Sequence, residues 1–97
     1  MLNTEDRNNV MCELLKLAIE ISETTKVDIF TSYSPHVSLF KLDVHLHGWG
    51  NEKCNTWYEL YLDSNEVSET SFNETGSTSK NISLTNLFEV LNNMLVK

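Results

Sequence analysis

The chain has 97 residues, of which 14 are acidic and 7 are basic, so its net charge is −7 at neutral pH. This length suits one small domain covering residues 1–97, and an apolar content of 40% is too high for a disordered chain. The acidic balance argues against ordinary nucleic-acid binding, because neutralising phosphates requires a basic patch.

Residues 4–24 are predicted to form an amphipathic helix, because apolar residues recur there with a period of about 3.6 residues. The period then changes to two. A short strand is predicted over 26–32 and the clearest strand over 37–47, with a turn at Pro35 between them. A turn that contains two glycines leads to a third strand over 55–62.

Residues 63–80 are rich in Ser, Thr, Asn and Glu. We predict a polar acidic loop or flexible insert there, with a poorly packed hairpin as the alternative. A last helix is predicted over 84–96, with Ser83 as a candidate N-cap. The predicted fold is therefore α+β: a helix, a three-stranded antiparallel meander and a helix, with both helices on one face of the sheet.

Alternation along the predicted strands assigns their residues to two faces. The helix-covered face would hold Val27, Ile29, Leu42, Val44, Leu46, Tyr58, Leu60 and Leu62. The opposite face would hold Asp28, Phe30, Lys41, Asp43, His45, His47, Trp57, Glu59 and Tyr61. Aromatic side chains among charges on an uncovered face suggest a contact surface. The same aromatics could instead stiffen the sheet as cross-strand pairs, or be covered by residues 63–80.

His45 and His47 are weak candidates for metal ligands. Imidazole and carboxylate groups bind metals, and Asp43 lies on the same side of the predicted strand. However, side chains four residues apart on a strand are separated by about 13 Å, so only His45 and one neighbour could chelate one ion. Ordinary surface histidines beside acids, or a pH-sensitive contact, are the other interpretations.

The sequence contains no glycine-rich phosphate loop, no Cys-x-x-Cys pair and no Gly-x-Ser-x-Gly motif, so we expect a non-enzymatic protein without a cofactor. The N-terminus has neither the basic start nor the apolar run of a secretory signal, and no segment is apolar enough to span a membrane. We therefore expect a cytoplasmic protein without membrane contact, in which Cys12 and Cys54 are reduced thiols.

Residues 54–79 contain no Lys or Arg and form the most acidic part of the chain. These carboxylates could simply keep a solvated loop soluble. Alternatively, they could imitate DNA phosphates and bind the basic cleft of a nucleic-acid-binding protein, with an attraction that weakens as salt rises. In that second interpretation the predicted partner-binding residues are Trp49, Trp57, Glu59, Tyr61, Asp63, Glu66, Glu69 and Glu74.

The stretch from Ile19 to Trp49 contains Ile21-Ser22-Glu23, Val27 to Phe30, Tyr33-Ser34, His36-Val37 and Gly48-Trp49. In these features it resembles short, uncharacterised proteins encoded by phages and prophages of low-GC Gram-positive bacteria. In size, charge and order of elements, the chain is also similar in type to small acidic anti-CRISPR proteins. The resemblance implies action in the host cytoplasm, against a protein such as a CRISPR effector nuclease, by occupying the groove meant for DNA.

The leading hypothesis is therefore a phage-encoded binding protein that inhibits a host defence or nucleic-acid-binding protein as an acidic DNA mimic. The second is a homodimeric accessory phage protein that buries the face containing Phe30, Trp57 and Tyr61. The third is a small metal-binding protein that uses His45 and His47.

Overall fold

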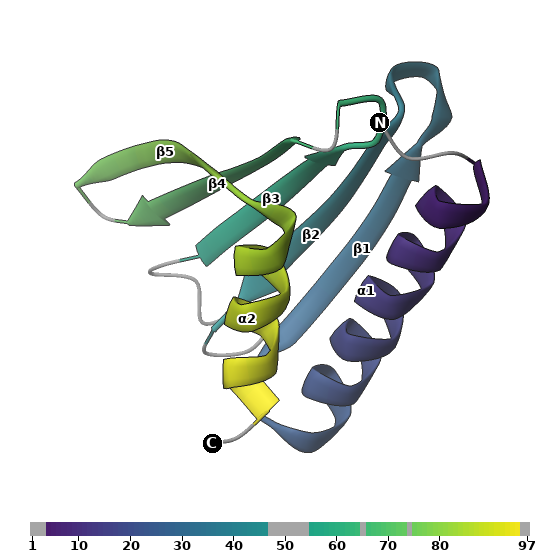
Figure 1. Cartoon of the computed structure of the whole chain (residues 1–97). Coiled ribbons are helices and arrows are strands. Elements are labelled where there is room, and N and C mark those ends of the chain that lie inside the picture. Colours follow the sequence, from purple (N-terminus) through teal and green to yellow (C-terminus); the bar gives the residue numbers. More distant parts are fainter. Residues whose placement is uncertain (1–3, 47–54, 65, 74, 96–97) are drawn as a thin grey trace.

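The computed structural model describes residues 4–46, 55–64, 66–73 and 75–95 (Figure 1). The chain begins with helix α1 (Thr4–Thr24) and ends with helix α2 (Leu84–Leu95). Between them lie β1 (Asp28–Ser34), the short 3-10 helix η1 (Pro35–Val37), β2 (Leu39–His45), β3 (Asn55–Tyr61), β4 (Glu66–Asn73) and β5 (Gly76–Ile82). No described helix is both long enough and apolar enough to cross a membrane.

The strands form one antiparallel sheet in which each strand pairs with the next along the chain, in the order β1-β2-β3-β4-β5. The α+β prediction with two helices is confirmed, but the prediction of three strands is wrong because the described residues form a five-stranded sheet. Most of the segment predicted as a loop, 63–80, forms β4 and β5. Apart from the pairs Val67–Ile82 and Phe72–Ser77, the cross-strand pairs of this hairpin contain no large apolar residue, so they give no regular hydrophobic alternation to detect.

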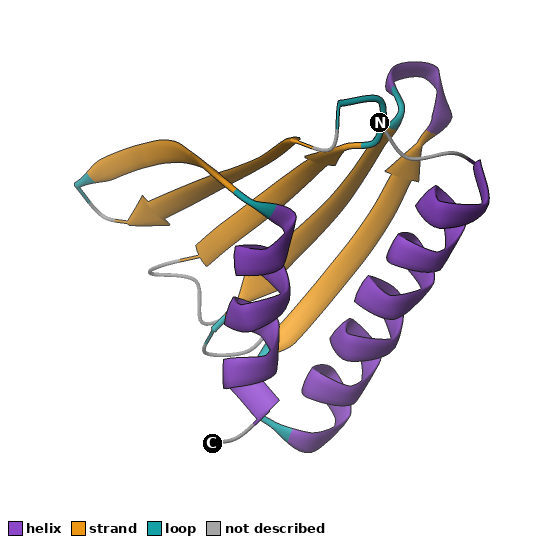
Figure 2. Cartoon of the chain, in the orientation of Figure 1, coloured by secondary structure: helices purple, strands orange, loops and turns teal. Residues whose placement is uncertain are grey.

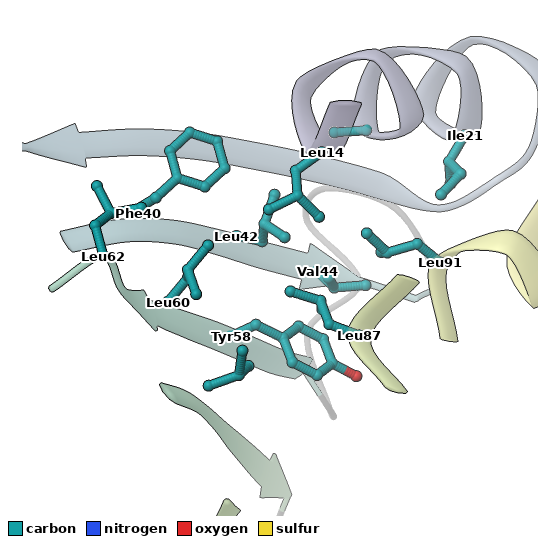
Figure 3. Close-up of a cluster of buried hydrophobic side chains, with 12 residues drawn as sticks. Leu14, Ile21, Phe40, Leu42, Val44, Tyr58, Leu60, Leu62, Leu87 and Leu91 are labelled. Atoms are coloured by element: carbon teal, nitrogen blue, oxygen red, sulfur yellow. The ribbon is translucent and has the colours of Figure 1, made fainter. Parts of the chain in front are cut away.

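Both helices lie on the same face of the sheet (Figures 1 and 2). Their apolar sides and the inward-facing strand residues enclose one core, part of which is shown in Figure 3. The buried apolar side chains of this core are Leu14, Ala18, Ile21, Phe40, Leu42, Val44, Tyr58, Leu60, Leu62, Val67, Leu87 and Leu91. The inward assignments of Leu42, Val44 and Leu60 are confirmed, whereas Leu46 is 39% exposed because β2 ends one residue earlier, at His45.

Short side-chain hydrogen bonds fix where the helices end. The backbone amide of Asn86 donates to Ser83 Oγ at 3.0 Å, which confirms Ser83 as the N-cap of α2. At the end of α1, the Thr25 hydroxyl donates to the Ile21 carbonyl at 2.7 Å and accepts from the Val27 amide at 3.0 Å. These bonds stop the helix and direct the chain into β1, so the helix and the strand pack side by side.

Candidate protein-binding face

The strand residues that point away from the helices form a second surface, which we call the outer face. The register between the strands places on it Asp28, Phe30, Ser32, Leu39, Lys41, Asp43, His45, Asn55, Trp57, Glu59, Tyr61, Glu66, Ser68, Thr70, Phe72, Ser77, Ser79 and Asn81. Neither helix lies over this face (Figure 1).

Aromatic rings are spread across the outer face from β1 to β4. Phe30 is 49% exposed, Tyr61 39% and Phe72 47%, while Trp57 is half-buried between them. Phe72 was missed as a surface aromatic in the sequence because it stands in the segment predicted as a loop. Its place on the outer face follows only from the β3–β4 register, which sets it opposite Asn55. Exposed rings that gather on one face are typical of interaction surfaces.

Trp57 occupies the centre of the outer face. Its register neighbours are Asp43 on β2 and Thr70 on β4. The ammonium group of Lys41 lies 5.4 Å from the centroid of the indole ring. This separation is within the range of a cation–π contact, so the chain itself places a cation on one of its outer-face aromatics.

His45 is 4% exposed, so its interpretation as an ordinary surface histidine is wrong. Its Nε2 lies 3.3 Å from Asp43 Oδ2, and its ring meets Phe30 in a T-shaped contact with centroids 5.3 Å apart. The other carboxylate oxygen of Asp43, Oδ1, accepts a hydrogen bond of 3.2 Å from the side-chain amide of Asn55. Among the described residues, His, Cys, Asp and Glu side chains nowhere gather in a group of three or more that could hold a metal. His47 lies outside the described residues.

The charges on the outer face are mostly negative. Its carboxylates come from four strands: Asp28 on β1, Asp43 on β2, Glu59 on β3 and Glu66 on β4. Lys41 is the only lysine or arginine on the part of this face that the structure describes. The face therefore combines apolar rings with a negative field, which suits a cationic partner.

The structure divides the predicted partner-binding residues among several places. Trp57, Glu59, Tyr61 and Glu66 share the outer face. Asp63 lies in the turn after β3, where its carboxylate is 3.7 Å from the guanidinium group of Arg7 on α1. Trp49 and Glu74 lie outside the described residues.

Glu69 lies on the helix-covered side of the sheet, so it does not belong to the outer face. It stands opposite Tyr58 on β3 and Lys80 on β5. Its carboxylate accepts a hydrogen bond from the Tyr58 hydroxyl and lies 3.4 Å from the Lys80 ammonium group. Burial raises the pKa of Tyr58, and the hydrogen bond and negative charge of Glu69 raise it further. Glu69 therefore has a structural position beside the core.

Comparison with known proteins finds no matching family model, no matching curated protein and no matching solved structure. A function for the chain must therefore be argued from the residues of the outer face and their geometry.

Proposed function

We propose that the chain is a non-enzymatic binding protein whose outer face docks on a basic, nucleic-acid-binding surface of another protein. In the form that the sequence suggests, it is a phage-encoded inhibitor of a host defence protein, similar in mode to an anti-CRISPR protein. It would act in the host cytoplasm by covering residues that otherwise contact DNA or RNA.

The observation that supports this function most is that exposed rings and carboxylates lie together on the outer face. Phe30, Tyr61 and Phe72 offer apolar contact area. Glu59 and Glu66 offer negative charge beside Tyr61. Aromatic residues often carry much of the binding energy of an interface, while complementary charge selects the partner and speeds its approach. A basic protein surface offers charge complementary to the carboxylates and can also contact the rings.

This assignment changes the residues that we expect to make contact. The mimic predicted from the sequence used a run of acids along one loop, but Asp63 is paired with Arg7 and Glu69 faces the helices. The proposed contact surface instead uses Trp57, Glu59, Tyr61 and Glu66 from the original set, with Phe72 added from β4.

Self-association through the outer face is the alternative use of the same surface. Two copies placed face to face would bring together their carboxylates, with only Lys41 on each described face to offset them. Like charges across an interface are unfavourable, so we expect a monomer. Sedimentation equilibrium should give a mass of 11.1 kDa at every concentration tested. A concentration-dependent dimer would favour the homodimer instead.

Capture from host lysate with two charge-matched variants tests the proposal. Glu59→Gln/Glu66→Gln removes two carboxylates from the outer face. Glu20→Gln/Glu23→Gln removes the same charge from exposed positions on α1. We expect wild type and the α1 variant to capture the same nucleic-acid-binding protein, identified by mass spectrometry, and the outer-face variant to recover much less of it.

The amount of captured protein that each variant recovers decides between the interpretations. Equal loss by both variants would mean that only the net charge matters and would contradict a specific outer face. Full recovery by both variants would mean that Glu59 and Glu66 do not contribute to binding and would contradict the outer face as the binding surface. Recovery of a protein without nucleic-acid affinity would contradict the proposed partner class.

A further inference from the structure

Tyr61 stands between two carboxylates on the outer face. Glu66 on β4 is its direct register partner, and Glu59 precedes it by two residues on the same strand and face. Strand geometry sets these neighbours at about 5 Å across the sheet and about 7 Å along the strand. The ring itself is 39% exposed. An aromatic surface is therefore flanked by carboxylates on two sides.

The two carboxylates beside Tyr61 differ from the other acids described above. Asp43 interacts with His45 and Asn55, Asp63 pairs with Arg7, and Glu69 contacts Tyr58 and Lys80. Within the described residues, by contrast, no side-chain hydrogen bond or ion pair is formed by Glu59, Tyr61 or Glu66. Glu59 stands opposite Lys41 in the register, but the ammonium group of Lys41 lies over the Trp57 ring. The polar atoms of Glu59, Tyr61 and Glu66 can therefore bind an incoming group without breaking a described contact.

We infer that Tyr61, Glu59 and Glu66 form a receptor for one arginine side chain of the basic partner. This inference rests on the function proposed above and adds which side chain the outer face recognises. The planar guanidinium group stacks on the tyrosine ring and donates hydrogen bonds from its edge to the carboxylates. The contact of Lys41 with Trp57 at 5.4 Å is an example of cation-on-ring chemistry on the same face.

Arginine fits this arrangement better than lysine. Its guanidinium group is flat, carries five donors in a fixed fork and is less strongly hydrated than an ammonium group. It can therefore cover the Tyr61 ring and reach a carboxylate at the same time, whereas a lysine ammonium group acts as a compact point charge.

Nuclear magnetic resonance titration with short peptides tests the inference on the intact chain. The probes are Gly-Ser peptides with a single central arginine, lysine or citrulline. We expect the arginine peptide to shift the resonances of Tyr61 and its neighbours, with an affinity about fivefold higher than that of the lysine peptide. The uncharged citrulline peptide should leave them unchanged. Tyr61→Leu should reduce arginine binding about fivefold, while Tyr61→Phe, which keeps the ring, should retain it.

Tyr33→Leu is the matched control, because Tyr33 is an exposed tyrosine outside the outer face whose register partner, Phe40, carries no charge. This variant should bind the arginine peptide as wild type does. Equal affinity for arginine and lysine, or an equal effect of Tyr61→Leu and Tyr33→Leu, would overturn the arginine receptor. If lysate capture still depends on Glu59 and Glu66 in that case, the proposed function survives; if capture is also independent of them, both fail.

Discussion

At the scale of single residues, Glu69 and Glu66 show how the pleat of one strand separates two roles. Glu66 points outward beside Tyr61, whereas Glu69 points toward the helix side and meets Tyr58 and Lys80. The Tyr58 ring belongs to the core, next to Leu87 of α2 (Figure 3). Its hydroxyl hydrogen-bonds to Glu69, so a polar group at the border of the core keeps a partner.

The raised pKa of Tyr58 predicts a loss of stability in alkali. In the folded chain, burial and Glu69 keep the hydroxyl protonated above its usual pKa of 10.0. The unfolded chain then binds fewer protons than the folded chain as the pH rises through 10 and beyond, so the free energy of unfolding falls over that range. Urea denaturation measured from pH 9 to pH 11 should show this decline.

Tyr58→Phe should remove the contribution of this hydroxyl to the decline and lower the free energy of unfolding by about 1 kcal/mol at neutral pH, where the hydrogen bond is lost. Tyr33→Phe is the control, since Tyr33 is 51% exposed and its removal should leave the alkaline slope unchanged. If the free energy of unfolding of Tyr58→Phe falls with rising pH as steeply as that of wild type, burial of this hydroxyl does not contribute to the pH dependence.

At the scale of elements, the helices and the first three strands follow from local periodicity, which is why they could be predicted from the sequence. β4 and β5 were predicted only as the alternative to a loop, a poorly packed hairpin. Their pairing depends on cross-strand contacts such as Thr70 with Ser79 at 2.9 Å and Glu69 with Lys80 at 3.4 Å. A list of polar residues in chain order does not show which of them will stand opposite each other.

The need to know which strands pair also explains how much of the candidate site could be predicted from the sequence. Trp57, Glu59 and Tyr61 were placed on one face by alternation within a single predicted strand, and the register agrees. Glu66 was grouped with Asp63 and Glu69 only by its charge, so its position beside Tyr61 was not foreseen. Phe72 needed the β3–β4 pairing, which sets it opposite Asn55.

The polar hairpin also predicts uneven stability within the sheet. β5 is an edge strand whose residues are exposed from Gly76 to Asn81. β2 and β3 each lie between two strands and supply Leu42, Val44 and Leu60 to the core. Local opening of β5 exposes little apolar surface and therefore costs less free energy than opening the central strands.

Hydrogen exchange should detect this difference. We expect the slowest amide of β5 to exchange about tenfold or more faster than the slowest amides of β2 and β3. We compare only the slowest amide of each strand, because some amides of the edge strand have no hydrogen-bond partner within the sheet. Equal protection across the sheet would contradict a weakly held hairpin.

At the scale of the whole molecule, the sheet separates the helix-covered core from the face for which we propose a binding role. The helices enclose the apolar core on one face, and the outer face carries rings and carboxylates. The net charge of −7 adds a long-range attraction toward basic surfaces, which strengthens as ionic strength falls. We therefore predict that the chain and a nucleic acid compete for the same surface of the partner protein.

A competition experiment with the captured partner and a fluorescent oligonucleotide that it binds decides whether the chain covers a nucleic-acid-binding surface. Adding the chain should release the oligonucleotide, and Glu59→Gln/Glu66→Gln should release it less well than Glu20→Gln/Glu23→Gln. If the partner instead holds the chain and the oligonucleotide together with unchanged affinity for each, the outer face does not cover a nucleic-acid-binding surface.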